Sequence, residues 1–417
     1  MMFNLLIFLN FIHSEIIVLP FQKKNEFKGD LYSYFFLNEL RTTISIGTPI
    51  QKIEAYIKPN KHHLFISGSD VNGEYKEYRS KTFKKELPKE RYFNGEPFKT
   101  GFLVNDTFDF LTENGKIIKI DCISFLLATK IDNRFDYIDS AQIGLGLYDT
   151  STIKEQNLLY QLNYLNSIQS YAYYFQFENY DKGKIIIGEK PHDYVIRFPD
   201  KIFNYFKIDT HSNDYQITFD KVSIGNNEYF KISAQFNFSF GGFITNEKNQ
   251  KIFDTFFNPL IDKSLCQKEK KDIFWFYSCN ESVNISEIQS IKFYHKGFNE
   301  SFELTYKDLF RKFKDKYYYM VIFQNQYRIE WIFGQIFFQK YKIIIDQNRK
   351  IMGLYKNNPI PKKNNFLYSW FFIFILTLII IIMLFLLYRR IKLIPKKIKA
   401  NELIDEEIKD DYFKILN

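Results

Sequence analysis

The sequence predicts a mainly β body followed by one membrane-spanning helix, and four observations lead to this prediction. The chain has 417 residues, which is long enough for two lobes with a sizeable core. Residues 41–66 alternate and are rich in β-branched side chains, as in two strands joined at Gly47-Thr48-Pro49. Residues 173–188 are typical of a hairpin that turns at Asp181-Lys182-Gly183. Residues 366–388 contain no charged side chain and are long enough to cross a bilayer as a helix.

The composition argues against disorder and does not indicate nucleic-acid binding. Hydrophobic residues make up 46% of the chain and aromatic residues 19%, which places it among globular proteins. The formal net charge is +9, but the lysines are scattered and a basic cluster after residue 388 supplies part of the excess. A nucleic-acid surface would gather this charge on one face. We therefore predict a solvated basic surface and no nucleic-acid partner.

Both ends of the chain carry signals of export and membrane insertion. Residues 1–14 form a short apolar run ending in a small residue, as in a secretory signal peptide. Residues 366–388 are predicted to be a transmembrane helix, and six basic residues follow it: Arg389, Arg390, Lys392, Lys396, Lys397 and Lys399. The positive-inside rule then places the tail, 389–417, in the cytosol. The prediction is a single-pass type I membrane protein with a lumenal or extracellular body, at the cell surface or along the secretory and endolysosomal route.

An ordered series of motifs runs from residue 42 to residue 355. It begins with Ile46-Gly47-Thr48-Pro49 and Gln51, and continues through residues 92–108, 141–147, 173–188 and 215–225. It ends with Trp331, Gly334, Phe337, Tyr341, Asp346, Ile351 and Gly353 in one fixed spacing. This series resembles the pepsin-like aspartic proteases. The resemblance implies two mostly antiparallel β-lobes facing each other across a cleft, with few helices.

The resemblance also implies the domain boundaries. A short lead-in at 15–39 precedes an N-terminal lobe at 40–190 and a C-terminal lobe at 195–356. A linker at 357–365 then leads to the membrane helix. Zymogens of this family carry a longer basic segment that plugs the cleft, and this lead-in leaves little room for one.

The two loops that would carry the catalytic aspartates depart from the family pattern. Where the first loop should read D-T-G-S-S, this chain has Lys58-Pro59-Asn60-Lys61-His62. In the second loop Asn237 stands in the place of the aspartate, Phe238 in that of the Ser or Thr, and Ser239 in that of the glycine. Both acids, both hydroxyls and both glycines are therefore absent in this register.

These substitutions remove the chemistry of the family. Two adjacent carboxylates share one proton, so that one serves as general base toward a water and the other as general acid. Lys58 offers an ammonium group and Asn237 an amide, neither of which can fill these roles at neutral or acidic pH. The chain is thus assigned to the aspartic-type endopeptidases by resemblance only, and no catalytic residue is assigned.

Two other catalytic arrangements were considered and are not favoured. His62 and His63 suggest a metal, but adjacent side chains on an extended segment diverge and no third ligand is evident. Ser239 and Lys58 could form a Ser/Lys pair across the cleft, but nothing else in the sequence supports one. We expect no metal and no cofactor.

The resemblance assigns further sites to the body of the protein. Residues 92–108 resemble the flap hairpin, which makes Tyr92 and Gly95 candidates for contact with a bound peptide. Cys266 and Cys279 stand where many pepsin-like proteins have a disulfide, and Cys122 is expected to be a buried apolar residue. Sequons predict glycosylation of an exported chain at four asparagines: Asn105, Asn280, Asn284 and Asn299. Asn237 also begins a sequon but is expected to lie inside the cleft, unmodified.

The sequence therefore favours a membrane-anchored, catalytically silent homologue that binds a peptide or protein through its cleft or surface. Two alternatives remain open. The chain is an active aspartic endopeptidase if the register at both loops is wrong, and it is a structural cell-surface glycoprotein if the cleft has no ligand.

Overall fold

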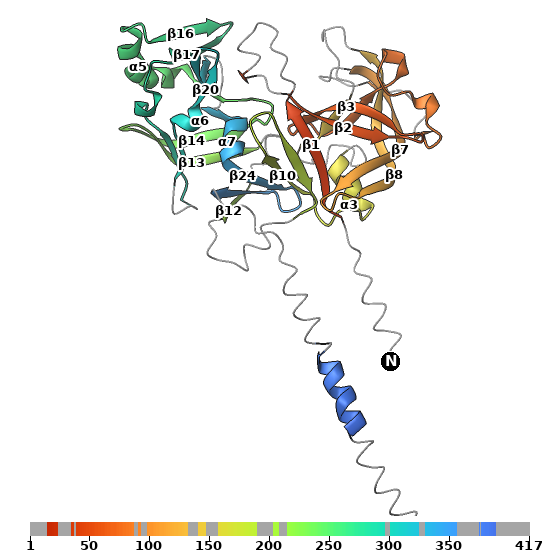
Figure 1. Ribbon diagram of the computed structural model, residues 1–417. Helices are drawn as coiled ribbons and strands as arrows, with labels where there is room; N and C mark the ends of the chain where they lie inside the picture. The colour runs from red at the N-terminus through yellow and green to blue at the C-terminus, as the bar shows by residue number, and fades with distance from the viewer. Residues whose placement is uncertain are drawn as a thin grey trace, which may run out of the picture. The chain divides into compact units, whose positions relative to one another are not determined.

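The computed structural model describes most of the chain up to residue 356 and part of the segment beyond it (Figure 1). The described residues are 15–23, 35–36, 39–86, 91–92, 98–131, 141–146, 157–189, 203–207, 215–296, 301–324, 330–356, 375 and 377–388. Two compact units, Met1–Asn358 and Pro359–Asn417, make up the chain. The predicted signal peptide at 1–14, linker at 357–365 and tail at 389–417 lie outside the described residues.

The described strands of the first unit form two large, mostly antiparallel sheets, so the predicted mainly β fold is confirmed. The 14-stranded sheet comprises β1 (Ile17–Lys23), β2 (Leu40–Ile46), β3 (Gln51–Lys58), β4 (Leu64–Ser67), β5 (Lys84–Lys85), β6 (Arg91–Tyr92), β7 (Phe98–Thr112), β8 (Ile117–Ile131), β9 (Ala141–Gly144), β10 (Ala172–Phe177), β11 (Lys182–Ile187), β12 (Phe203–Lys207), β24 (Tyr341–Asp346) and β25 (Ile351–Lys356).

The 11-stranded sheet comprises β13 (Gln216–Ile224), β14 (Asn227–Phe236), β15 (Phe243–Asn246), β16 (Cys266–Lys271), β17 (Phe274–Asn280), β18 (Ile291–Tyr294), β19 (Phe302–Leu304), β20 (Phe310–Phe313), β21 (Lys316–Tyr319), β22 (Val321–Gln324) and β23 (Trp331–Phe333). The described α-helices of this unit that have assigned bounds are short: α3 (Leu158–Tyr164), α5 (Glu247–Ile261), α6 (Tyr306–Leu309) and α7 (Gln335–Lys340).

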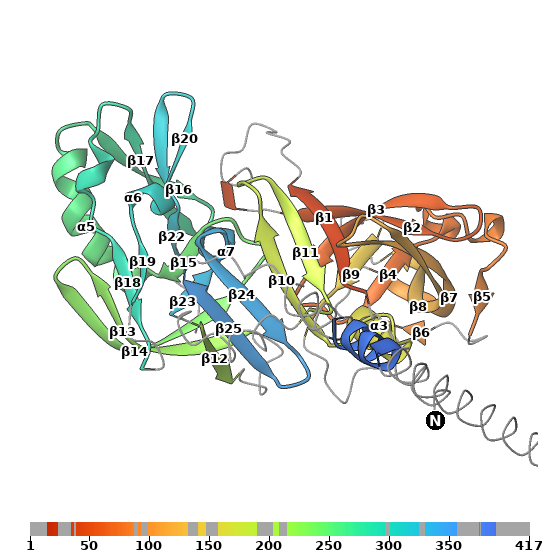
Figure 2. The same cartoon turned by 60° about the horizontal axis from the view of Figure 1, so that its bottom comes forward.

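The larger sheet joins strands from both predicted lobes. β10 pairs with β24 from Ala172↔Asp346 to Tyr174↔Ile344, and Figure 2 shows these strands side by side. β12 pairs with β25 at the end of the same sheet. The sheets therefore do not follow the predicted lobe limits of 190 and 195. The lead-in at 15–39 also contributes to this sheet, because β1 pairs with β11 from Ile17↔Ile187 to Gln22↔Lys182.

One local topology occurs twice in this unit. β3 and β4 are separated by β9, which runs parallel to β3 and antiparallel to β4. In the other sheet β14 and β15 are separated by β23 in the same way. Because the middle strand blocks direct pairing, each pair must be joined by a loop that passes over the end of that strand. These are the two loops in which the sequence departs from the protease pattern.

Local predictions were confirmed at some positions and corrected at others. The turn at residues 47–50 occurs as expected, and residues 59–60 also form a turn. The hairpin of β10 and β11 turns at residues 178–181, just before the predicted site, because Phe177 pairs with Gly183. The predicted disulfide between Cys266 and Cys279 is formed.

Cys122 is exposed and free of a disulfide, so its predicted burial was wrong. The cause is an irregularity in the pairing of β7 with β8, where Asp106 pairs with Ile123 and Phe108 with Ile120. The extra residue breaks the alternation of side chains, and Cys122 takes a positive φ of 62° at this bulge. Simple alternation along 117–131 could not reveal it.

Lys23 at the end of β1 gives a pH-dependent contribution to stability. Its side chain is 6% exposed, its Nζ lies 4.2 Å from the centre of the Tyr180 ring, and Asp181 and Arg311 are the charged groups that act on it. Burial is the main cause that lowers the pKa of Lys23 to about 7; Asp181 opposes this shift and Arg311 adds to it. The unfolded chain therefore binds more protons than the folded chain between about pH 7 and 10, so stability rises with pH in that window.

We expect Lys23→Met to flatten this rise, by up to about 1.4 kcal/mol per pH unit. Thermal melts of both proteins at pH 6.5, 8 and 9.5 measure it. Lys182→Met, which removes an exposed ammonium group, is the matched control and should keep the wild-type slope. If stability rises with pH as steeply in Lys23→Met as in the wild type, Lys23 is not the group responsible for the rise.

In the second unit the described part of the predicted membrane segment, 377–388, is helical. No helix among the described residues is both long and apolar enough to cross a membrane. Residues 366–374 and 376 of the predicted span lie outside the described residues.

Candidate functional site

The two loops begin at equivalent points of their sheets. Lys58 is the last residue of β3 and pairs with Gly144 of β9. In the other sheet Phe236 of β14 pairs with Phe333, and the next residue, Asn237, donates its backbone N–H to the Phe333 carbonyl at 2.8 Å. Lys58 is therefore the last residue of its strand and lies beside Gly144, the last residue of the middle strand β9. Asn237 directly follows its strand, and Gly334 directly follows the middle strand β23. The two positions thus stand at matching points of the repeated topology.

Close backbone packing holds each loop against its middle strand. The N–H groups of Leu145 and Gly146 donate to the carbonyls of Lys58 and Lys61 at 3.2 and 2.6 Å. In the second loop the Gln335 N–H donates to the Phe240 carbonyl at 2.7 Å. A Cβ on Gly334 would lie 2.2 Å from the Gly242 carbonyl oxygen, so only glycine fits there.

Lys58 belongs to an ion-pair cluster on the face of β2 and β3. Its Nζ lies 3.3 Å from Glu39 Oε1. The guanidinium of Arg41 lies 3.7 Å from the Glu39 carboxylate and also pairs with the Glu54 carboxylate. It stacks on Tyr56, 4.1 Å from the centre of the ring. Two cations thus meet two carboxylates, and the ammonium of Lys58 has an acidic partner. The sequence offered no signal for this cluster, because Glu39 lies in the stretch expected to be a lead-in.

Asn237 is used to shape its own loop. Its Oδ1 accepts the backbone N–H of Ser239 at 3.0 Å, and its carbonyl accepts the N–H of Phe240 at 3.3 Å. An asparagine that bonds two residues ahead is a standard way to close a turn. Among the described residues Asn237 and Lys58 share no hydrogen bond, so the polar groups at the two positions are not joined as an acid pair would be.

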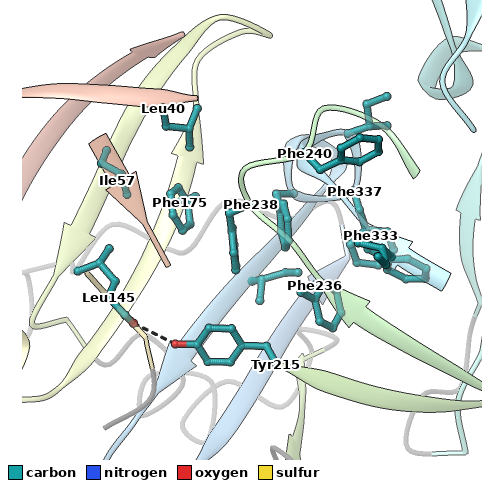
Figure 3. Close-up of a cluster of buried hydrophobic side chains, with 14 of the residues drawn as sticks. Leu40, Ile57, Leu145, Phe175, Tyr215, Phe236, Phe238, Phe240, Phe333 and Phe337 are labelled. Atoms are coloured by element: carbon teal, nitrogen blue, oxygen red, sulfur yellow. Dashed lines mark hydrogen bonds between the residues drawn. The ribbon is translucent and has the colours of Figure 1, made fainter. Parts of the chain in front are cut away.

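Phe238 fills the place where the family has a hydroxyl. Its ring is stacked between Phe338, with centroids 4.0 Å apart, and Phe175, with centroids 4.6 Å apart. Only 2% of the side chain is exposed. Figure 3 shows Phe238 between Phe175 of β10 and the phenylalanines of the other sheet. The Phe238 ring connects β10 with α7 through an apolar stack. No hydroxyl is available at this position to cross-link the two loops.

Buried polar bonds surround this stack. The Tyr215 hydroxyl donates to the Leu145 carbonyl at 3.0 Å and lies 2.9 Å from the Tyr173 hydroxyl. Gln347 Nε2 donates to the same Leu145 carbonyl at 2.8 Å. Burial raises the pKa of both tyrosines well above the usual value for a phenol, so both remain neutral donors. The network fixes the loop segments and offers no group that titrates near the pH of a cell compartment.

Gln142 lies in the middle strand β9 and Gln335 follows the middle strand β23, and both amides are buried. Gln335 is fully buried, and its Nε2 donates to the Phe238 carbonyl at 2.8 Å, which supports the second loop. Gln142 is 3% exposed and its Nε2 has no hydrogen-bond partner among the described residues. Neither amide can supply a proton-transfer group at the loops.

Asp106, a carboxylate close to the flap hairpin in sequence, is already satisfied. It is buried and accepts the Tyr75 hydroxyl at 2.6 Å, the Thr107 N–H at 2.8 Å and the Thr82 hydroxyl. Burial and the bond to Asp106 raise the pKa of Tyr75 well above its ordinary value. The carboxylate therefore ties the base of the hairpin to its neighbours.

The remaining predicted site residues are only partly described. Tyr92 pairs with Thr100 where β6 meets β7, while Gly95 lies outside the described residues. Asn280 and Asn284 are exposed, Asn105 is half-buried with its Nδ2 bonded to Glu86 at 3.2 Å, and Asn299 lies outside the described residues. His62 and His63 diverge, with ring centres 6.3 Å apart, and the described residues contain no group of three or more metal-ligating side chains.

Comparison with known proteins identifies the fold. No family model matches the sequence, and no curated protein matches it. The basic 7S globulin from soybean superposes with a TM-score of 0.61 at 16% identity, covering 82% of this chain and 95% of the globulin. Conglutin gamma, a basic 7S globulin from lupine seeds, gives 0.61 at 13% identity, covering 83% and 95%. The chain shares their fold. At these identities the likeness shows the fold alone, and with the two large sheets it is consistent with the bilobal pepsin-like architecture.

Proposed function

We propose that this chain is a membrane-anchored pepsin-like homologue that is catalytically inactive and binds a peptide or protein through its cleft or surface. The observation that carries the proposal is that both dyad-equivalent positions hold groups with other roles. Lys58 pairs with Glu39, and Asn237 closes its own turn. Neither position supplies a carboxylate to act as base toward a water between the loops.

The rest of the loop chemistry supports inactivity. Phe238 occupies the hydroxyl position with a ring stacked on both faces, so a carboxylate restored at Asn237 would still lack its cross-link to the other loop. An aspartic endopeptidase needs both loops at once, since one carboxylate must donate as the other accepts. No described residue at either loop takes over the missing roles.

Membrane anchoring and export are proposed from the sequence. The uncharged run 366–388 and the basic residues after it support a single crossing with the body outside the cytosol. The apolar run 1–14 supports entry into the secretory pathway, at the surface or on the endolysosomal route.

Ligand binding is tested with the full chain, solubilised in detergent and immobilised through its C-terminus. A peptide library is passed over it, and bound peptides are eluted and sequenced. We expect retention of a defined peptide class, weakened about tenfold or more by Tyr92→Ala, because an aromatic anchor in a cleft contributes ~2 kcal/mol to binding. Tyr164→Ala, which removes a side chain that is 73% exposed on α3, is the matched control. No retained peptide class, or equal loss in both variants, would refute cleft binding.

A further inference from the structure

A pocket of about 480 Å³ opens in the 11-stranded sheet, away from the two loops. Its walls come from the turn between β13 and β14, the 3-10 turn at Ile285–Glu287, β18 and the start of α6. None of its lining residues belongs to the loops that carry Lys58 and Asn237. The function proposed above makes no use of this pocket.

The walls present mostly neutral hydrogen-bonding groups and phenol rings, together with the charged side chains of Glu287 and Lys292. Hydroxyls come from Ser223, Ser290 and Thr305, an amide from Asn226, and rings from Tyr294 and Tyr306. The one lysine of the lining, Lys292, lies 3.4 Å from Glu303 Oε1, so its charge is balanced. A wall with many hydroxyls, two phenols and no unbalanced cation suits a neutral polyol better than a phosphate or a lipid tail. Sugars match this chemistry, because they offer hydroxyls at their edges and C–H faces for aromatic rings.

Asn284 lies at the edge of this pocket. It is exposed and stands immediately before the 3-10 turn that forms one wall. Its Nδ2 donates to Oε1 of Glu287, a lining residue, at 2.8 Å, and its Oδ1 accepts the Ser286 hydroxyl at 2.6 Å. Nδ2 is the atom to which an N-linked glycan attaches, and Asn284-Ile285-Ser286 is a sequon. A sugar on Asn284 therefore starts within hydrogen-bond length of the pocket wall.

We propose that the pocket holds the first N-acetylglucosamine units of a glycan on Asn284, so that the protein carries a sugar-binding site for its own modification. This inference rests on the proposed export. The glycan arrives from a lipid-linked oligosaccharide diphosphate: the Nδ2–C1 bond forms, the C1–O bond to phosphate breaks, the lipid diphosphate leaves and Nδ2 releases one proton. The remaining N–H of the amide can keep its bond to Glu287. The seated sugars cover the β13–β14 turn and stack on Tyr306.

Asn280 provides an internal comparison. It is an exposed sequon asparagine four positions earlier, but its Nδ2 donates to the Ser264 carbonyl at 3.2 Å and it does not line the pocket. A glycan on Asn280 should remain in solvent. The two asparagines are therefore close in sequence and both exposed, and they differ in whether an attached sugar can reach the pocket.

The test is site-resolved deglycosylation of the full chain. The protein is produced in eukaryotic cells with a standard export signal in place of residues 1–14, which makes the result independent of the natural signal. Native and denatured samples are treated with a peptide-N-glycosidase, and release at each asparagine is followed by mass spectrometry. In the native protein we expect release at Asn284 about tenfold slower than at Asn280, which corresponds to ~1.4 kcal/mol of protection. After denaturation the two rates should agree.

Two pocket variants separate seating of the sugar from simple crowding at the site. Tyr306→Ala removes a ring of the wall, and Asn226→Trp fills the pocket from an exposed turn position outside the core. Each should bring native release at Asn284 close to that at Asn280, while Tyr164→Ala leaves both unchanged. An unmodified Asn284, equal native rates in the wild type, or slow release that persists in both pocket variants would overturn the proposal. Peptide retention by the same samples reports separately on the proposed cleft function.

Discussion

Replacing Phe238 with alanine is expected to lower the free energy of unfolding by about 3–5 kcal/mol. The ring is buried and makes close stacking contacts on both faces, with Phe338 and with Phe175, so truncation leaves a cavity that stiff neighbouring strands cannot close. Phe175 comes from β10 and Phe338 from α7, so the loss weakens contacts between distant parts of the unit. Urea unfolding of the purified protein, monitored by tryptophan fluorescence, measures the change.

Phe230→Ala is the matched control, because its ring is 67% exposed and its loss should change stability by less than about 0.5 kcal/mol. Phe238→Ser restores a family-like hydroxyl and should destabilise at least as much as alanine, since it also buries a polar group in an apolar stack. A loss below about 1 kcal/mol for Phe238→Ala would show that the stack does not hold the loop.

Gly334→Ala is expected to prevent accumulation of folded protein. A Cβ at this position would lie 2.2 Å from the Gly242 carbonyl oxygen and 2.3 Å from the Phe240 carbonyl oxygen. Both atoms belong to the backbone, so no side-chain rotation relieves the clash, and the loop must leave β23. The yield of folded, protease-resistant full chain extracted in detergent is the measurement.

Gly115→Asn serves as the control for this glycine. Nothing lies within 4 Å of a Cβ at Gly115, and asparagine tolerates its positive φ of +77° better than most other residues do. Yield should stay near the wild-type level. A normal yield of Gly334→Ala would mean that the second loop does not pack on β23 as described.

Much of the fold and the position of the site could be predicted because spaced motifs constrain long stretches of chain. Gly144, Gly146 and Gly334 belong to these motifs, and the structure places each of them in close contact with one of the two loops. The register at Lys58 and Asn237 followed from these fixed spacings. The structure places both positions at equivalent points of a repeated topology.

Other features depend on contacts between residues far apart in sequence and could not be predicted. The loss of a hydroxyl at Phe238 was visible, but its stacking partners lie 63 and 100 positions away, at Phe175 and Phe338. The ion pair of Lys58 with Glu39 links a strand end to the preceding segment. The bulge that exposes Cys122 arises from pairing between two long strands, not from its local sequence.

The account depends on the absence of a proton-transferring acid pair at Lys58 and Asn237, and hydrolysis of an acid-denatured protein substrate tests this most directly. The purified full chain is incubated with the substrate between pH 3 and 6, with and without a statine-type inhibitor. We predict no inhibitor-sensitive cleavage at any pH. Cleavage that the inhibitor blocks, and that is lost in Asn237→Ala, would contradict the account.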